Sequence, residues 1–429
     1  MNPPPGKAPG ASLVFRHCRQ LVTCAGPAPR RGRAQGAIDV LSDGALAVTG
    51  ERVLFAGPTA DLDRAVNVSS ARVVDVPHLS IVPGFVDAHT HAVFAGDRRQ
   101  ELQQRLAGAT YAGIAAQGGG IVATVRATRA ASEEALVVES RSRFDEMLAC
   151  GTTTCEVKSG YGLDLASELK MLRAIRRLSA EHPLDIVPTF MGAHEVPMEH
   201  RSRREVYVDS VVHEMIPAVA AERLAEWCDV FCETGVFTPE ESRRILEAGL
   251  RAGLAARIHA DELGPSGGSA VAAGIGARSA DHLIFVPEPG IAAMAAAGVT
   301  ATLLPCAAFY LKLGRFAPAR ALIAASVPVA LATDVNPGGG FSPSMPFAIA
   351  LGCFAMGLTF EEALVAATIN GAWSIDRADQ TGSLEPGKLA DAVFVRGDGI
   401  NLIRVGAPAI GAVLKRGRIV HGDVEDEAH

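Results

Sequence analysis

Hydrophobic and polar positions alternate regularly through the middle of the chain. Eight short apolar runs are separated by stretches with helical spacing, and most runs end beside a polar residue. The runs end near His91, Lys158, His194, Glu233, His259, His282, Pro305 and Asp334. Repeated strand–helix units predict an α/β fold, a TIM-like (β/α)8 barrel, in which functional side chains gather at the C-terminal ends of the strands. Residues far apart in the sequence are therefore expected to meet on one rim.

Two helix starts in this region are marked by their own residues. Thr238 and Thr359 are each followed three residues later by a glutamate, the order of a capping box. Pro239 occupies the first position of one of these helices, which is expected to stop near Gly253.

The two ends of the chain share a different pattern. Short β-like runs lie between residues 12 and 83 and again after residue 390. We therefore predict a small β-sandwich domain assembled from both termini, with the barrel inserted between its halves. The predicted division is 1–83 and 385–429 for the β domain and 84–384 for the barrel, with the Pro- and Gly-rich residues 1–10 disordered.

Composition argues against several other classes of protein. The 429 residues contain no long apolar run, which predicts no membrane span, and the first residues lack the pattern of a secretory signal. A net charge of -7, spread along the chain, argues against nucleic-acid binding. The eight cysteines are scattered and form no CxxC pair, which is typical of a protein kept reduced in the cytoplasm.

The first barrel run leads into two histidines, His89 and His91. Alternate side chains of a β-strand share a face, so both imidazoles are expected to point the same way and to bind one transition-metal ion. A lone histidine is usually structural. Five of the twelve, however, fall at predicted strand ends: His89, His91, His194, His259 and His282. Their gathering on one rim indicates a metal or catalytic site.

Asp334 follows the last barrel run and offers a carboxylate at the same rim. A lone aspartate here would equally cap the turn at residues 336–338. Beside His89, His91 and His259, the role of fourth ligand is favoured, with water at the open position. Three imidazoles and one carboxylate suit Zn²⁺ or Fe²⁺ better than Mg²⁺ or Ca²⁺.

Two charged side chains near these ligands are candidates for catalysis and binding. Glu262, three residues after His259, could take a proton from metal-activated water, or could merely stabilise a helix N-terminus. Asp261 has the same ambiguity and ranks lower. Arg98 could bind a substrate carboxylate through its two-pronged guanidinium, although exposed arginines are usually solvated.

Other features nearby allow two interpretations. Tyr161, between two glycines, indicates a binding turn. Lys158 could be a bridging carbamylated lysine of a two-metal site, but a structural or orienting role is favoured because no ligands for a second metal are evident. Residues 97–128, with Tyr111 and the glycine triplet 118–120, predict a lid over the barrel mouth. The triplet lacks the lysine of a phosphate-binding loop, so a tight turn is favoured.

The ordered set of motifs resembles the amidohydrolase superfamily. PGFVDAHTH at 83–91 and GSLEPGKLAD at 382–391 are similar to its opening and closing signatures. Further motifs narrow the resemblance to the imidazolonepropionase family of histidine breakdown. They are FAGDR at 94–98, LAGATY at 106–111, GGGI at 118–121, EVKSGYGL at 156–163, GAH at 192–194, HADEL at 259–263 and DVNPG at 334–338.

The resemblance implies a metal-dependent hydrolase that converts 4-imidazolone-5-propanoate into N-formimidoyl-L-glutamate. It implies one zinc or iron ion (Zn²⁺, Fe²⁺ or Fe³⁺) per chain, with ligands His89, His91, His259 and Asp334. The implied catalytic residues are Glu262, His282 and Asp334. The implied substrate contacts are Arg98, Tyr111, Tyr161, His194, Glu262, Asn336, Gly338 and Gly339. Where the family often carries Thr or Ser, Gly339 could contact substrate only through its backbone.

Two other functions stay open from the sequence. One is another cyclic-amide hydrolase or a deaminase of the same superfamily, and a deaminase would release ammonia in its first step. The other is a metal-free assembly protein on the same barrel, which elemental analysis would reveal. The expected partners are a small-molecule substrate with a carboxylate and a second copy of the chain in a homodimer, with no nucleic acid and no membrane.

Overall fold

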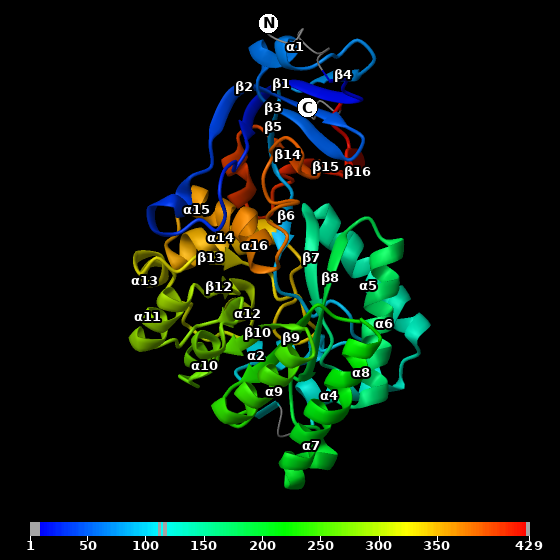
Figure 1. Cartoon of the computed structure of the whole chain (residues 1–429), viewed down its shortest axis with the longest axis vertical. Helices are drawn as coiled ribbons and strands as arrows, with labels where there is room; N and C mark the ends of the chain where they lie inside the picture. The colour runs from blue at the N-terminus through cyan, green and yellow to red at the C-terminus, as the bar shows by residue number, and fades with distance from the viewer. Residues whose placement is uncertain (1–8, 110–112, 115–117, 426–429) are drawn as a thin grey trace, which may run out of the picture.

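The computed structural model describes residues 9–109, 113–114 and 118–425, and within them two eight-stranded sheets form (Figure 1). The lower sheet in Figure 1 is a parallel barrel in which each strand pairs with the next in the chain. Its strands are β6 (Phe85–Asp87), β7 (Thr152–Lys158), β8 (Asp185–Ala193), β9 (Trp227–Cys232), β10 (Ala255–Ala260), β11 (Ser279–His282), β12 (Thr300–Leu303) and β13 (Val329–Leu331). The predicted barrel is confirmed.

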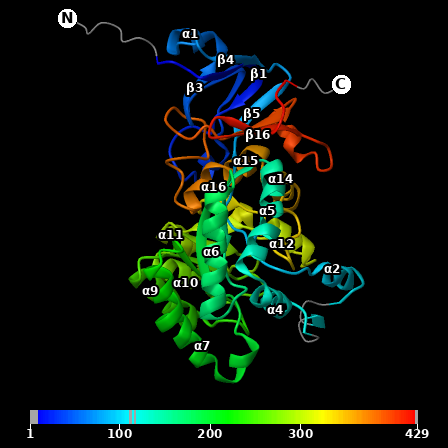
Figure 2. The same ribbon diagram turned by 90° about the vertical axis from the view of Figure 1, so that its right-hand side faces the viewer.

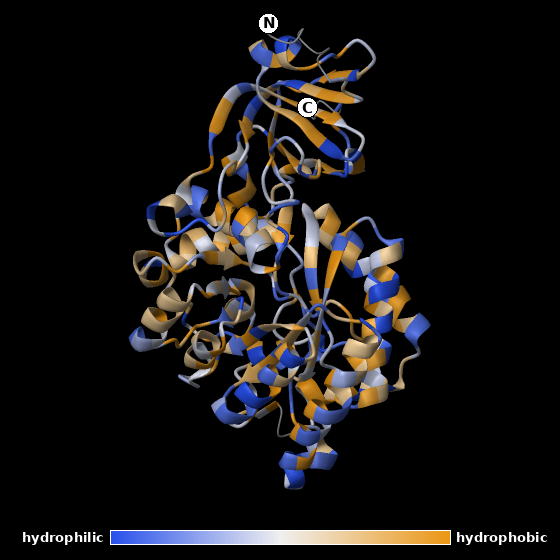
Figure 3. Ribbon diagram, viewed as in Figure 1, coloured by the Kyte–Doolittle hydropathy of each residue, from blue (hydrophilic) through white to orange (hydrophobic). Residues whose placement is uncertain are grey.

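Helices surround this barrel, most of them on its outside, while α2 projects to one side (Figure 2). They are α2 (Arg99–Leu106), α4 (Ile121–Ala130), α5 (Glu133–Ala149), α6 (Leu165–Glu181), α7 (Arg204–Ser210), α8 (Ile216–Ala221), α9 (Pro239–Arg251), α10 (Gly268–Ile275), α11 (Glu288–Ala297), α12 (Pro305–Tyr310), α13 (Ala319–Ala324), α14 (Met345–Met356), α15 (Phe360–Ala367) and α16 (Ile369–Ser374). Figure 3 shows that hydrophobic and hydrophilic residues alternate along the outer helices, because one face of each packs on the barrel. Both predicted capping boxes form, at the starts of α9 and α15.

The second sheet is built from both ends of the described chain and lies beside one end of the barrel (Figure 2). The order β16-β15-β14-β5-β1-β2-β3, with β4 beside β1, joins its strands into one hydrogen-bonded sheet, and the short helix α1 (Leu62–Ala65) packs near it. The strands are β1 (Leu13–Val22), β2 (Val40–Thr49), β3 (Arg52–Pro58), β4 (Arg72–Asp75), β5 (Leu79–Pro83), β14 (Ala392–Arg396), β15 (Ile410–Lys415) and β16 (Arg418–Gly422). A β domain assembled from both termini is therefore confirmed.

The chain enters the barrel from the second sheet through a single residue, Gly84, between β5 and β6, and returns to that sheet through α14, α15 and α16. A Cβ at Gly84 would lie 2.4 Å from Oγ1 of Thr153, so only glycine lets the chain pass this close to β7. The exact division at 83/84 and 384/385 stays a prediction, and residues 1–8 and Tyr111 lie outside the described residues.

Two local expectations differ from the structure. The first barrel strand ends at Asp87, so His89 and His91 lie in the extended segment after it and not on the strand itself. The segment 97–128 is also not a plain loop, since α2 and the start of α4 lie within it.

Candidate metal centre and active site

The side chains of His89, His91, His259 and Asp334 converge at the C-terminal rim of the barrel. Nε2 of His91 lies 3.2 Å from Nε2 of His259, and Oδ1 of Asp334 lies 3.7 Å from Nε2 of both His89 and His91. All four side chains are buried, with at most 4% of any residue exposed. The predicted ligands thus meet at one point.

Backbone hydrogen bonds join the segments that follow the first and the last barrel strands, β6 and β13. The amide of Asp334 donates to the carbonyl of His89 at 3.1 Å, and the amide of His91 donates to the carbonyl of Val335 at 2.9 Å. Asp334 adopts a φ of 52°, in the left-handed region that non-glycine residues rarely occupy. Such strain is characteristic of functional sites, where the surrounding contacts enforce it.

Buried carboxylates orient two of the imidazoles. Nδ1 of His89 donates to Oδ2 of Asp281 at 2.7 Å, and Nδ1 of His259 donates to Oδ1 of Asp229 at 3.1 Å. In each ring the proton therefore sits on Nδ1, so the lone pair of Nε2 points into the centre. Burial lowers the pKa of His89 well below its usual value, which keeps the ring neutral.

The residues present fit a bound metal ion. Nε2 of His89 and Oδ1 of Asp334 are buried and have no hydrogen-bond partner among the residues that the structure describes. A zinc or iron ion about 2.1 Å from each ligand atom would separate tetrahedral ligands by about 3.4 Å, close to the separations above. Neutral imidazoles with one carboxylate are the donors that such ions prefer.

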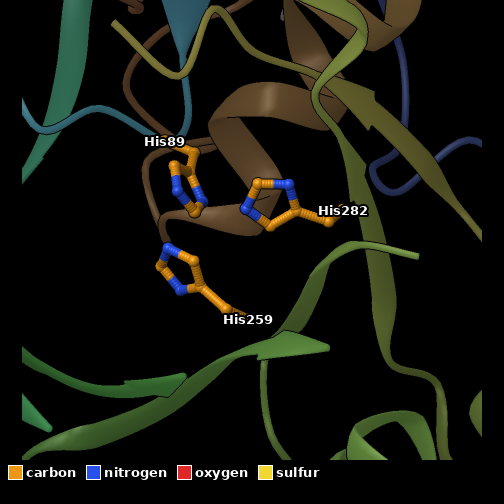
Figure 4. Close-up of side chains that lie close together, drawn as sticks. All are labelled: His89, His259 and His282. Atoms are coloured by element: carbon orange, nitrogen blue, oxygen red, sulfur yellow. The ribbon is translucent and has the colours of Figure 1, made fainter. Parts of the chain in front are cut away.

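His282 lies in the same cluster. Figure 4 shows its ring beside those of His89 and His259, and the ligand atoms of these three side chains lie within 4.8 Å of one another. Nδ1 of His282 is 3.6 Å from Oε1 of Glu262, and its φ of 71° is again left-handed. Geometry alone would allow His282 to act as a ligand, so its predicted catalytic role stays a prediction.

Glu262 faces the same cavity, whereas its neighbour Asp261 does not. Burial and the nearby carboxylate of Glu233 raise the pKa of Glu262 to about 8. The carboxylate of Asp261 instead accepts hydrogen bonds from the amides of Gly267 and Ser269, at the start of α10. The structure thus gives Asp261 the helix-capping role and leaves Glu262 in the cavity.

Most of the predicted substrate contacts line one cavity above the ligands. Its walls are His91, Arg98, Ile121, Tyr161, His194, Phe231, His259, Glu262, Leu263, His282, Leu311, Asp334, Asn336, Gly338 and Gly339. Arg98 is held from below by Glu101, whose Oε2 accepts from its Nη2 at 2.7 Å. His194 stacks on His91 with ring centroids 4.9 Å apart, and its Nδ1 lies 3.0 Å from the carbonyl oxygen of Gly160.

The turn after Asp334 is capped by Asn336 and not by Asp334. Oδ1 of Asn336 accepts from the amides of Gly338 and Gly339 at 2.8 and 2.6 Å, and its Nδ2 donates to the carbonyl of Asp334 at 2.8 Å. The carboxylate of Asp334 does not cap the turn and lies beside His89 and His91. The turn-capping alternative for Asp334 does not apply, because its neighbour performs that task.

The three glycines of this turn, at positions 338 to 340, differ in the space available for a larger side chain. A Cβ at Gly340 would lie 1.7 Å from the carbonyl oxygen of Asp334, and one at Gly338 would lie 2.2 Å from the guanidinium of Arg98. A Cβ at Gly339 would only touch Leu311 at 3.5 Å, an ordinary contact. The departure from the family pattern at position 339 is therefore not forced by space.

Replacing Gly339 with threonine should leave the fold intact and lower KM a few-fold, because a hydroxyl enters the cavity without a clash. The matched change Gly340→Ala should destabilise the protein by about 1–3 kcal/mol, since the Asp334 carbonyl must move. Thermal unfolding and steady-state kinetics of both variants test this. Equal stability losses in the two variants would contradict the description of the turn.

The sequence analysis singled out Lys158 but not the buried acids around it. Lys158 lies among the buried acids Glu156, Asp229 and Asp281, with Nζ 2.8 Å from Glu156 Oε1 and 2.7 Å from Asp229 Oδ2. Close contact with two carboxylates suits an ammonium, which favours the orienting role over carbamylation. The available signal was a set of charged residues inside otherwise apolar strands, such as Asp229 in β9.

Comparison with known proteins agrees with this geometry. Residues 80–422 match the model of the amidohydrolase family. An imidazolonepropionase of Symbiobacterium thermophilum is 50% identical over 95% of this chain and 97% of its own length. An imidazolonepropionase of Geobacillus kaustophilus is 49% identical over 89% of this chain and 91% of its own length.

The fold is also found among solved structures. An adenosine deaminase from Xanthomonas campestris, solved with bound zinc, superposes with a TM-score of 0.71 at 18% identity, covering 97% of this chain and 94% of that one. The chain belongs to the amidohydrolase family, and relatives at 42–50% identity are imidazolonepropionases. None of the helices in the described part of the chain has the length and apolar character that crossing a bilayer requires.

Proposed function

We propose that this chain is a metal-dependent hydrolase that adds water to 4-imidazolone-5-propanoate and opens the ring to N-formimidoyl-L-glutamate. The observation that carries the proposal is the convergence of His89, His91, His259 and Asp334 beneath a cavity that also presents Arg98 and Glu262. The imidazolonepropionase relatives supply the substrate class.

The four converging side chains would hold one zinc or iron ion. When bound, such an ion acts as a Lewis acid that makes water a strong nucleophile near neutral pH. Asp281 and Asp229 would orient the rings of His89 and His259 so that their Nε2 lone pairs face the same point.

Substrate orientation is assigned to the walls of the cavity. Arg98 would pair with the propanoate tail, because a buried guanidinium binds a carboxylate with two parallel hydrogen bonds. Tyr161, His194 and the turn containing Gly338 and Gly339 would surround the ring. Asn336 would act mainly by holding that turn. Fixing the ring above the ligands removes much of the orientational entropy cost before the reaction begins.

Proton transfer is assigned to Glu262, with His282 beside it. Glu262 would take a proton from the attacking water as the new C–O bond forms at the ring carbonyl. It would pass that proton to the ring nitrogen as the C–N bond breaks. A pKa near 8 suits a group that must both accept and return a proton near neutral pH. His282 would donate a hydrogen bond to the developing oxyanion.

The direct test uses the metal-loaded protein and freshly prepared 4-imidazolone-5-propanoate. Loss of the imidazolone ultraviolet absorbance, with N-formimidoyl-L-glutamate as the product and no early ammonia, is the expected result. Release of ammonia in the first step would identify a deaminase instead. No turnover by protein that carries its metal would overturn the proposal.

Replacing Arg98 with alanine should raise KM with little change in kcat. Loss of a hydrogen-bonded charge pair costs about 1.5–3 kcal/mol, or about 10- to 150-fold. The neighbouring Arg99→Ala is the matched control, since that side chain is 81% exposed and pairs with Asp97. Unchanged KM in the Arg98 variant would reject the carboxylate clamp.

We further propose that the protein works as a homodimer in the cytoplasm. The eight cysteines all lie in the described part of the chain and all are free, which supports a reducing compartment. Phe354, 78% exposed on α14, offers apolar surface of the kind that protein partners cover.

A further inference from the structure

A cluster of charged side chains lies inside the barrel, directly beneath the converging histidines. Its members are Glu156 and Lys158 on β7, Asp229 on β9, Arg257 on β10 and Asp281 on β11, and each is fully buried. Three carboxylates face two cations, so the cluster carries an excess of negative charge below the metal site. Burying so many charges is costly unless they are paired.

Lys158 joins two of these carboxylates, and each of the two supports a different part of the metal centre. Asp229 receives the ammonium on Oδ2 and holds the ring of His259 with Oδ1. Glu156 receives the ammonium on Oε1 at 2.8 Å, while its Oε2 accepts from the amide of Thr90 at 3.3 Å. Thr90 is the residue between His89 and His91.

The backbone of Lys158 strengthens the same connection. Its amide donates to the carbonyl of Thr90 at 3.0 Å, and the hydroxyl of Thr90 donates to the carbonyl of Glu156 at 2.7 Å. The segment carrying His89 and His91 is thus attached to the end of β7 by three hydrogen bonds. Lys158 therefore contacts both Glu156, which holds the segment of His89 and His91, and Asp229, which holds His259.

The ammonium also occupies the oxygen of Asp229 that His259 does not use. Oδ1 of Asp229 lies 3.1 Å from Nδ1 of His259, and Oδ2 lies 2.7 Å from the ammonium of Lys158. Without the ammonium, Oδ2 of this fully buried carboxylate would lose its charged partner, so the carboxylate would be expected to move and to hold the His259 ring less firmly.

We propose that Lys158 is a positioning residue for the metal centre, which sets the mutual placement of the histidine pair and His259 through Glu156 and Asp229. The inference rests on the metal ligands of the proposed function. It assigns to Lys158 neither contact with substrate nor a place among the metal ligands.

The test compares metal affinity in Lys158→Met with that in the wild-type protein. Chelator competition should show the dissociation constant for zinc rising about 10- to 100-fold, the range found when outer supports of metal ligands are lost. The visible spectrum of the cobalt-substituted protein should change in band position or intensity, because ligand geometry changes. Zinc affinity and a cobalt spectrum equal to those of the wild type would overturn the proposal.

Lys415→Met is the matched control. Lys415 is also buried and joins two carboxylates, Asp391 at 2.6 Å and Asp185 at 2.8 Å, but these lie at the other end of the barrel. This variant should lose stability while its metal affinity stays within about twofold of the wild type. A similar fall in affinity in the two variants would show a general loss of stability and reject the proposal.

A second variant covers the case in which Lys158→Met fails to fold. The double change Lys158→Met with Asp229→Asn removes one of the two buried carboxylate charges that the ammonium had paired, so it should fold and bind zinc more weakly than Asp229→Asn alone. If neither variant folds, the cluster supports the barrel and not the centre, and the proposal is wrong. Failure of the wild-type protein to bind metal would instead overturn the proposed function.

Discussion

His259→Asn should remove both the bound metal and turnover. Nε2 of His259 lies 3.2 Å from Nε2 of His91, and Asp229 holds the other ring nitrogen, so replacing His259 removes one well-oriented ligand from the set. Several kcal/mol of transition-state stabilisation disappear with the ion, which corresponds to at least about 10³-fold in kcat. Elemental analysis of the purified variant and the ultraviolet assay measure the two effects.

Two other histidines give the controls for this result. His182 is buried and lies 3.1 Å from Asp145, far from the rim, so His182→Asn should keep metal and turnover. His282→Asn should keep the metal and lose turnover, and asparagine tolerates the left-handed φ of that position. Full metal content in His259→Asn, or none in His282→Asn, would contradict these assignments. His282 would then be the metal ligand and His259 the catalytic residue.

Glu262→Gln should keep the metal and lose about 10²- to 10⁴-fold in kcat, because glutamine preserves the shape of the side chain but cannot carry the proton. The carboxyl faces the cavity, and its Oε1 is 3.6 Å from His282. Steady-state kinetics, with metal content measured on the same sample, separates this loss from a loss of the ion.

The control for Glu262 is its neighbour. Asp261 caps α10 through Gly267 and Ser269, so Asp261→Asn should cost stability and leave kcat within a few-fold. A glutamine variant at 262 that works near full speed would refute the proton-transfer role. Such a result would move that role to His282.

The positions of the ligands followed from the sequence because parallel strands end at one rim. The runs predicted to end near His259 and His282 end at Ala260 and His282 in the structure. The capping boxes at Thr238 and Thr359 form because they are local, and local hydrogen bonding needs no knowledge of the fold.

What the sequence did not predict depends on contacts between distant strands. Asp229 reaches His259 from the neighbouring strand β9, and Asp281 on β11 reaches His89, which follows β6. Which of Asp334 and Asn336 caps the turn also could not be decided from the sequence, because both can accept from backbone amides; in the structure Asn336 does so. The segment at 99–106 forms a helix, in keeping with its Gln, Arg and Leu residues, whereas the prediction treated all of residues 97–128 as a long loop.

The pairing of β5 has a consequence for synthesis of the protein. This fully buried strand lies between β1 and β14, so one of its partners, residues 392–396, leaves the ribosome more than 300 residues after it. Until then β5 has an open hydrophobic edge, which is prone to association with other chains. A nascent chain must therefore shield this edge during almost all of translation, and a premature stop before β14 would leave it exposed for good.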